Sequence, residues 1–438
     1  MKATKYTALA LSALLCVSAC TEIDYPDPTF TESGYNSVTS PTQTDNTEPP
    51  TTTTSVSQAT ETADTSEITA ENRPTVNESI DYAAFDARIE EIARSLNVVG
   101  MGLCVFAEGE VIYSTNYGCA DREAGIPTDD NTLYRTASVS KMISTMVLMT
   151  LYDQGVLEVD SQLEPLTGIS YNNPALDKPV LLRHLLTHTS GLADGETYNT
   201  AYQYKYDLEY VLSKSYSGYE PGTLYSYSNL GAGTIGAIIE KLTGEFFHYY
   251  ADKALFKPLG MDAGYCADLI SARHNAANLY QGGELAGAPK TWGRSTAYYE
   301  SYGLGNSYHT AQCELLITPT DLARLGIVLA GDGSVDGVRV LSEEAVNAMN
   351  ATYYTNNALP FDMGLCVRKY NGNLVKGRTI HGHPGQALGS VNGLYYDPSD
   401  GTGVAICSTG CDPSFNVENE VYTLLDECVN TVYKTFFS

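Results

Sequence analysis

Residues 135–151 read RTASVSKMISTMVLMTL, a short polar segment followed by an almost uninterrupted apolar run. The run stops near Asp153, and Gly155 stands where a helix C-cap is common, so the stretch predicts a buried helix. Ser138 and Lys141 are three residues apart and would share one face at the start of this helix. The helix dipole favours developing negative charge at that end.

The Ser138–Lys141 spacing suits nucleophilic catalysis. A serine hydroxyl is a poor nucleophile until a base takes its proton. A lysine that is partly desolvated in an apolar helix can have its pKa lowered enough to help. The spacing alone is weak evidence, because a capping serine beside a solvated lysine produces it equally well.

A second segment, residues 221–231, reads PGTLYSYSNLG and leads into a helix expected over 232–242. A tyrosine acts as a base near neutral pH only if a cation stabilises its phenolate, and Lys141 could supply that charge to Tyr227. Asn229 can offer one amide hydrogen bond to a substrate and another to Lys141. The alternative is an ordinary loop tyrosine in a chain with 33 tyrosines.

A third segment, residues 381–389, reads HGHPGQALG and leads into a strand, with Gly385 allowing close backbone approach. His381 and His383 also suggest a metallo-lactamase HxHxD motif, but Gly385 occupies the aspartate position. We therefore expect no metal and no cofactor. No serine lies in a GxSxG elbow, which argues against an α/β-hydrolase.

Together these motifs resemble those of the penicillin-recognising serine hydrolases. The nearest branch holds class C β-lactamases, D-Ala-D-Ala carboxypeptidases, D-amino-acid peptidases and β-lactamase-like esterases. The resemblance covers about residues 80–438. Beyond the three motifs it includes further segments in the same order, namely LLTHTSGL at 185–192, TPTDLARLG at 318–326 and RVLS at 339–342.

The resemblance implies an α/β (α+β) fold of the β-lactamase/transpeptidase type. An antiparallel sheet flanked by terminal helices would be joined to an all-helical subdomain over about 134–310, with the site in the cleft between them. It also implies a role for each motif residue. Ser138 would be the acylated nucleophile, Lys141 and Tyr227 the proton-transfer pair with the base left open, and Asn229 would position the substrate amide. His383 would fill the first place of the third motif, Gly385 its glycine, and the backbone N–H groups of Ser138 and Gln386 would form the oxyanion hole.

One departure from the family pattern affects the expected substrate. The lactamases usually carry Lys-Thr-Gly in the third motif, whereas this chain has His383-Pro384-Gly385. The threonine hydroxyl is lost, and proline, which has no N–H, fits only on an edge strand. A mostly neutral histidine also removes the fixed cation for a β-lactam carboxylate. A D,D-peptidase or an esterase is therefore expected before a true β-lactamase.

The ends of the domain predict its sheet and outer helices. Apolar spacing predicts helices over 81–96 and 416–436. Alternating runs and turn residues predict strands over 102–106, 111–117, 363–370, 389–396 and 403–408.

The N-terminal 79 residues predict a lipoprotein leader and a tether. Lys2 and Lys5 precede an apolar stretch that ends at Val17-Ser18-Ala19-Cys20, so residues 1–19 read as a signal peptide and Cys20 as the lipidated residue. An ordinary cleavable signal is the alternative. Residues 20–79 are rich in Thr, Ser and Pro and hold 11 acidic residues against one arginine, which predicts a disordered tether. The expected location is the extracytoplasmic face of the cell membrane.

The charge and the cysteines restrict the partners and the redox state. A formal net charge of −27 argues against nucleic-acid binding. Eight cysteines remain after Cys16 and Cys20, which permits disulfides in an exported chain without fixing a pairing.

The nine tyrosines from Tyr198 to Tyr227 suggest either aromatic walls for a glycan or peptide, or ordinary packing.

The sequence thus predicts an extracytoplasmic serine hydrolase with an acyl-enzyme on Ser138. Its substrate would be a small-molecule or peptide acyl compound, with cell-wall peptide among the candidates. The alternatives are a true class C-like β-lactamase, a non-catalytic binding or sensor lipoprotein, and a structural surface lipoprotein.

Overall fold

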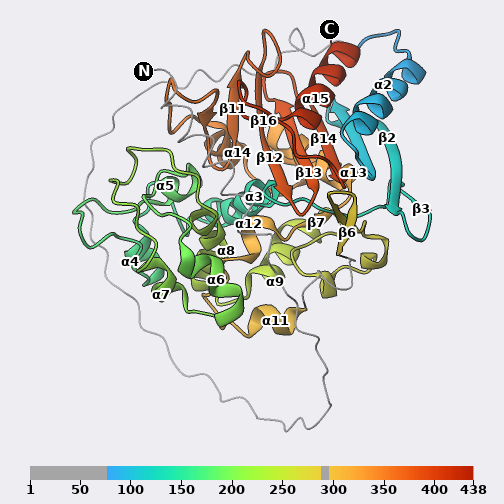
Figure 1. The fold of residues 1–438 in the computed structure, drawn as a ribbon. Coiled ribbons are helices and arrows are strands. Elements are labelled where there is room, and N and C mark those ends of the chain that lie inside the picture. Colours follow the sequence, from blue (N-terminus) through green and yellow to red (C-terminus); the bar gives the residue numbers. More distant parts are fainter. Residues whose placement is uncertain (1–75, 288–294, 438) are drawn as a thin grey trace, which may run out of the picture.

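The computed structural model describes residues 76–287 and 295–437, and its centre is an eight-stranded antiparallel sheet (Figure 1). The strand order is β10-β11-β12-β13-β14-β1-β2-β3, so strands from both ends of the chain meet at the β14–β1 pair. The strands are β1 (Gly100–Ala107), β2 (Glu110–Asp121), β3 (Ile126–Pro127), β10 (Asp362–Met363), β11 (Arg368–Asn371), β12 (Thr379–Ala387), β13 (Ser390–Asp397) and β14 (Thr402–Thr409).

The first hairpin follows the pattern of its sequence. β1 is buried along its whole length, and the tight turn to β2 is made by Glu108 and Gly109, both with positive φ. The glycine adopts this conformation without steric cost. The hairpin predicted from the sequence is confirmed.

The two terminal helices, α2 (Tyr82–Ser95) and α15 (Thr423–Phe436), lie side by side on one face of the sheet (Figure 1). α2 begins at Asp81, whose side chain accepts a hydrogen bond from the Ala84 N–H, and its apolar stripe is buried. The folded part begins before residue 80, because the Asn77 N–H donates to the Phe436 carbonyl at 3.0 Å.

The other face of the sheet is covered by α13 (Pro319–Ala330), which begins in the predicted TPTDLARLG segment. Thr318 caps this helix by accepting from the Asp321 N–H. A Cβ atom on Gly326 would lie 2.6 Å from the Phe106 ring and 2.8 Å from Leu394. The glycine therefore lets the helix approach the strands closely.

The segment between β2 and α13 is mostly helical, as expected, and lies on the side of the sheet away from α2 and α15 (Figure 1). It also contains a small hairpin, β5 (Leu279–Gln281) and β6 (Glu284–Gly287), and β4 (Tyr134–Arg135) pairs with β7 (Leu316–Ile317). Its α-helices are α3 (Val139–Asp153), α4 (Leu163–Thr167), α5 (Leu182–Leu186), α6 (Glu196–Tyr204), α7 (Leu208–Leu212), α8 (Asn229–Thr243), α9 (Phe247–Ala251), α11 (Thr296–Glu300) and α12 (Thr310–Cys313).

Two predicted elements differ from the structure. The strand expected over 363–370 is two short strands, β10 and β11, separated by a bend in which Cys366 has a φ of 54°. The helix expected over 416–436 starts only at Thr423, because the hairpin β15 (Phe415–Asn416) and β16 (Val421–Tyr422) takes the preceding residues. The apolar spacing did not separate a short hairpin from a helical turn.

The leader, the lipidation site Cys20 and almost all of the tether lie outside the described residues. Within the described part, no helix combines the length and the apolar character needed to cross a bilayer. All eight cysteines of the domain are free thiols there, and seven of them are buried.

Candidate active site

Ser138 lies where the chain enters α3 and is partly exposed, whereas its neighbours on both sides are buried. The preceding residue, Ala137, has a φ of 49°, a left-handed conformation that is unusual for alanine. Such strain persists only where the surrounding structure holds it, and it often marks a functional site. Here it turns the backbone so that Ser138 stands at the helix N-terminus.

Lys141 is fully buried one turn into α3, and its ammonium lies against the serine. Nζ donates to Ser138 Oγ at 2.9 Å and to the Gln312 carbonyl at 3.1 Å. The sequence spacing predicted the first contact but not the second, because Gln312 comes from α12, far along the chain. The lysine is thus held at hydrogen-bonding distance from the candidate nucleophile.

Tyr227 joins this pair from the loop before α8. Lys141 Nζ lies 5.2 Å from the centre of its ring, a cation–π distance. The ring of His188 lies 4.2 Å away at 30°, and that of His383 lies 6.3 Å away at 40°. The structure therefore brings the serine, the lysine and the tyrosine of three separate segments together.

His188, from the LLTHTSGL segment, supports the loop that carries Tyr227 through two hydrogen bonds. Its carbonyl accepts from the Ser226 N–H at 2.8 Å, and its Nδ1 accepts from the Ser228 N–H at 3.2 Å. Burial and then the charge of Lys141 hold the pKa of His188 well below its usual value. The ring is therefore neutral and carries its proton on Nε2, a buried atom with no hydrogen-bond partner in the described structure.

Asn229 is the first residue of α8 and is only 7% exposed. Its Nδ2 donates to the Asp194 carboxylate at 2.9 Å. From the sequence this amide is expected to contact the substrate and Lys141, and no sequence pattern indicates a role for Asp194. One of the two amide hydrogens of Asn229 is therefore used in the bond to Asp194, which lies in the loop after α5.

The third motif lies within β12. His383 Nδ1 lies 2.6 Å from the Pro384 carbonyl, which places the ring proton on Nδ1 because a carbonyl only accepts. Burial, and then the charges of Arg368 and Lys141, hold the pKa of His383 well below its usual value. Nε2 is left as a buried acceptor without a partner in the described structure. His381 instead contacts Asn350, at 2.8 Å.

Gly385 allows β12 to touch the start of α3. A Cβ atom there would lie 2.3 Å from the Thr136 carbonyl oxygen and 3.0 Å from the Ser138 nitrogen. This places the backbone of Gln386, the next residue, beside the nucleophile. β11 pairs with β12 only as far as Gly382. At Pro384, therefore, the side of β12 that faces β11 has no paired strand in the described structure. The expected edge strand is therefore wrong for β12 as a whole, which lies between β11 and β13, but Pro384 stands beyond the end of the β11 pairing, where its missing N–H breaks no ladder bond to β11.

Arg368 is a buried cation near the third motif that the sequence analysis missed. Its Nη1 donates to the Glu420 carbonyl at 3.1 Å, and its guanidinium lies 4.3 Å from the centre of the Phe361 ring. Its Nε has no partner in the described structure. Its charge acts on both His188 and His383. Only burial next to aromatic rings distinguishes this arginine, and no sequence pattern signalled it.

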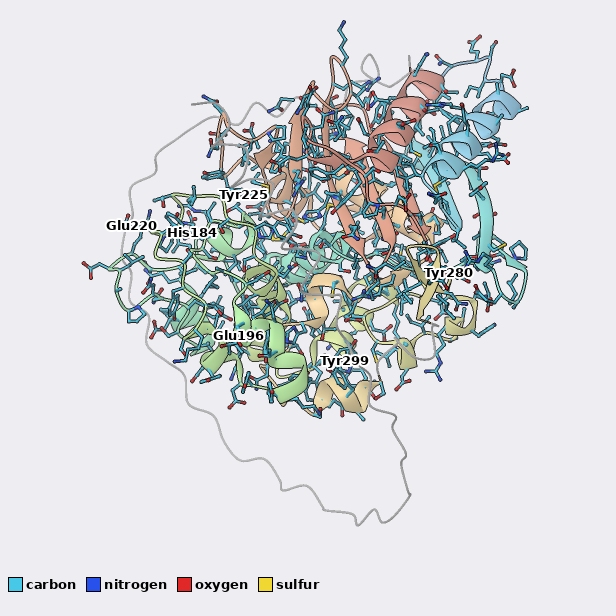
Figure 2. The ribbon with its side chains drawn as sticks, in the orientation of Figure 1. His184, Glu196, Glu220, Tyr225, Tyr280 and Tyr299 are labelled. Atoms are coloured by element: carbon cyan, nitrogen blue, oxygen red, sulfur yellow. The ribbon has the colours of Figure 1, made fainter. Side chains whose placement is uncertain are left out.

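The predicted tyrosine cluster divides in the structure. Tyr225 packs edge-on against His188 at 5.9 Å, and Figure 2 shows it where the helical region meets the sheet. Tyr198 is buried and bonds to the Gln312 side chain. Tyr204, Tyr210 and Tyr219 are exposed. The tyrosines therefore do not form one continuous wall at the site.

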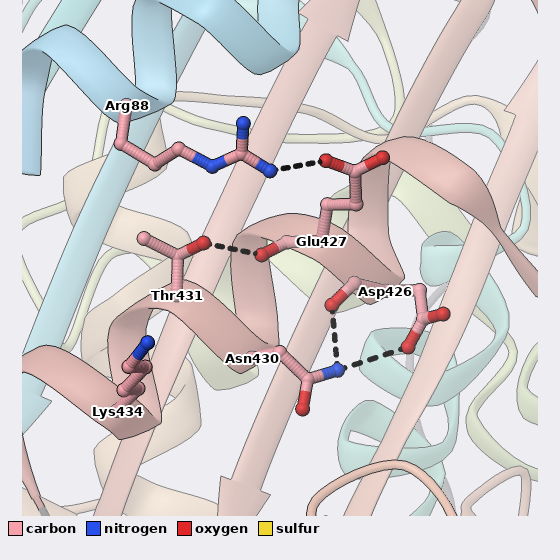
Figure 3. A pocket seen from close by; sticks show the side chains of 6 residues that line it. All are labelled: Arg88, Asp426, Glu427, Asn430, Thr431 and Lys434. Atoms are coloured by element: carbon pink, nitrogen blue, oxygen red, sulfur yellow. Dashed lines mark hydrogen bonds and ion pairs between the residues drawn. The ribbon is translucent and has the colours of Figure 1, made fainter.

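A surface hollow of about 440 Å³ lies elsewhere, between α2 and α15 (Figure 3). Arg88 of α2 pairs there with Glu427 of α15 at 2.8 Å, and both side chains are exposed. No motif residue lines this hollow.

In the described part of the chain, no group of three or more His, Cys, Asp or Glu residues is placed to hold a metal ion.

A serine at a helix N-terminus, a buried lysine one turn later and a tyrosine from a neighbouring loop define the acyl-serine hydrolase class of this fold. Comparison with known proteins agrees. The Beta-lactamase family model matches residues 85–426, so the chain belongs to the beta-lactamase family. It is a serine hydrolase.

Individual relatives show the range of the family. Penicillin-binding protein 4 of Amycolatopsis lactamdurans is 26% identical, over 75% of this chain and 86% of its own length. Esterase EstB of Burkholderia gladioli is 32% identical over 43% of this chain and 53% of the esterase, about half its length. The structure of D-alanine carboxypeptidase AmpC from Burkholderia cenocepacia superimposes with a TM-score of 0.62 at 18% identity, covering 81% of this chain and 98% of that protein. This last likeness establishes the shared fold.

Proposed function

We propose that the protein hydrolyses acyl compounds through an acyl-enzyme on Ser138, with D-amino-acid peptides and esters as the substrate class. The observation that carries the proposal is the 2.9 Å contact between Lys141 Nζ and Ser138 Oγ, made by a lysine that is 0% exposed. A solvated lysine beside a capping serine, the ordinary explanation of the spacing, would not be buried in this way.

The reaction proceeds in two steps. Ser138 Oγ attacks the acyl carbonyl as its proton passes to Lys141 in its neutral amine form or to the Tyr227 phenolate, and that proton is then given to the leaving amine or alcohol. Water then attacks the acyl-serine ester, releases the acid and returns the proton to Ser138. The backbone N–H groups of Ser138 and Gln386 stabilise the negative oxygen in both steps, and one such donor is worth about 10²–10³ in rate.

The third motif favours a peptidase or an esterase over a β-lactamase. His383 is neutral and presents an acceptor atom where the lactamases usually present the ammonium of a lysine. A β-lactam carboxylate would therefore meet no fixed positive charge from this residue. The name of the esterase relative supports the ester class.

The position of Arg368 supports a D,D-carboxypeptidase reaction. Its unpartnered Nε and its influence on His383 put a positive charge near the third motif. Such a charge would suit the free carboxylate at the end of a peptide substrate, and equally that of a β-lactam, so it separates both from a neutral ester. Arg368→Gln should therefore weaken hydrolysis of a D-Ala-D-Ala peptide and leave hydrolysis of a neutral ester unchanged.

For the location, we propose the extracytoplasmic face of the membrane, with lipid attached at Cys20. The proposal is supported by the leader pattern and by the acidic Thr- and Ser-rich segment before the domain. Metabolic labelling with an alkyne fatty acid tests it. Cys20→Ser should abolish the label if the site is correct.

The catalytic proposal is tested by a fluorescent fluorophosphonate and a fluorescent penicillin. The wild type should be labelled, Ser138→Ala should not, and both should melt at about the same temperature. Labelling by the phosphonate alone would favour an esterase over a carboxypeptidase. A folded wild type that neither probe labels, and that is inactive on ester, D-peptide and lactam panels, would instead favour a binding or sensor protein.

A further inference from the structure

We propose that Asp194 is the positioning residue of the Tyr-x-Asn motif and sets the acylation rate of Ser138 through Asn229. This inference rests on the acyl-serine mechanism proposed above. Asp194 lies in the loop after α5, outside the segments that carry the nucleophile, the base and the third motif. Its carboxylate nevertheless accepts four hydrogen bonds from the second motif.

Four donors of the second motif meet this carboxylate. Oδ1 accepts from Ser228 Oγ and from the Leu230 N–H, each at 2.9 Å. Oδ2 accepts from the backbone N–H and from the side-chain Nδ2 of Asn229, each at 2.9 Å. Hydrogen bonds to a carboxylate are stronger than those between neutral groups, so this clamp is a firm one. The donors at the start of α8 also match the sign of the helix dipole.

The clamp decides which way the Asn229 amide faces. With Nδ2 directed at Asp194, the planar amide turns Oδ1 away from the carboxylate. Asn229 therefore offers the site an acceptor, able to receive an N–H of the substrate or of Lys141, and keeps one amide hydrogen to donate. An unclamped amide could rotate by 180° and exchange its oxygen for its nitrogen.

His188 completes the support from the opposite side of the loop. The Ser228 N–H donates to His188 Nδ1, while the Ser228 hydroxyl donates to Asp194. The loop that carries Tyr227 and Asn229 is thus held between an imidazole and a carboxylate. Of these two, only Asp194 touches the Asn229 side chain, so its removal should act on the orientation of Asn229.

The test is a double-mutant cycle on the full chain, read by the rate at which a fluorophosphonate labels Ser138. Asp194→Asn replaces one accepting oxygen with an NH₂ group that faces the donors of the second motif. Because this misplaces Asn229, labelling should slow roughly 10- to 100-fold. Asn229→Ala should also slow it. If Asp194 acts through Asn229, the double variant should be labelled less than about threefold more slowly than Asn229→Ala alone.

Asp262→Asn is the matched control. Asp262 is also partly buried and accepts from two loop N–H groups, those of Ser271 at 2.8 Å and Ala272 at 2.7 Å, but it contacts no motif residue. This control should lower the melting temperature without slowing the labelling. Should Asp194→Asn not fold, Asp194→Glu keeps the charge, changes the reach, and should show the same coupling to Asn229.

The outcomes separate the inference from the proposed function. Full additivity of Asp194→Asn and Asn229→Ala, or equal slowing by Asp262→Asn, would show that Asp194 is merely structural and overturn the inference. A wild type that is not labelled at all would remove the proposed function, and the inference with it. Labelled wild type with a non-additive cycle supports both.

Discussion

Gly385→Ala offers the sharpest test of the geometry around Ser138. The added methyl group would lie 2.3 Å from the Thr136 carbonyl oxygen, 2.9 Å from the Val139 nitrogen and 3.0 Å from the Ser138 nitrogen. All three are backbone atoms at the start of α3, so none can rotate away. To reach ordinary contact, β12 and α3 must separate by about 1 Å, a displacement that can cost about 10²-fold in rate at an active site.

The same shift moves the Gln386 N–H relative to the Ser138 N–H, the two groups proposed above as the oxyanion hole. Removing one such donor costs about 10²–10³ in rate, which sets the upper range of the expected loss. Overpacking of this kind costs about 1–3 kcal/mol of stability. The assay is the hydrolysis rate of a p-nitrophenyl ester together with the melting temperature.

Gly100→Ala provides the control for stability alone. Its methyl group would lie 2.2 Å from the Cys119 carbonyl oxygen, but on β1, three strands away from β12. The control should lose stability and keep its rate per folded molecule. A folded Gly385→Ala variant that reacts as fast as the wild type would refute the close approach as a requirement for catalysis.

Two further predictions concern proton transfer and acid stability. Lys141→Met should slow labelling of Ser138 by about 10²–10⁴-fold. A smaller decrease in the labelling rate of Tyr227→Phe would identify the lysine as the base. Equal decreases would show that the two residues act together. Burial lowers the pKa of His184 and of His248 to about 4, and that of His381 to about 3, from 6.5. Because the folded pKa values are the lower ones, stability is highest above pH 6.5 and is lost as the pH falls through the folded pKa of each group. The loss is about 3 kcal/mol for each of His184 and His248, towards pH 4, and about 5 kcal/mol for His381, towards pH 3. Urea midpoints at pH 7.5 and 4.5 measure this, and His381→Gln should weaken the dependence.

The sequence predicted those parts of the fold that depend on local patterns. The helix at Ser138, the first hairpin and the strand expected over 389–396 (β13) are determined by apolar spacing and turn residues close in the chain. The strand β12, which holds the third motif itself, was not predicted from the local pattern, which placed the motif before a strand. The hairpin before α15 was missed because its strands are only two residues long. At that length a strand and a helical turn have the same pattern.

The site was predictable where family motifs carry it and not where tertiary packing does. Ser138, Lys141 and Tyr227 stand in recognisable motifs, and the fold brings them together. Asp194 and Arg368 are charged residues in ordinary sequence surroundings. Their importance comes from contacts with segments 34 or more residues away, such as the bond from Arg368 to Glu420, which no local pattern encodes.

The two ends of the described domain lie close together, which has a practical consequence. The Asn77 N–H meets the Phe436 carbonyl at 3.0 Å, and the Asn77 side chain donates to the Thr435 carbonyl at 2.6 Å. A short peptide linker could therefore join the ends without disturbing the sheet, and new ends could be opened in an exposed loop. A circular permutant opened at the Glu108–Gly109 turn would still hold all three motifs, and its refolding would show whether the β1–β2 hairpin must be continuous.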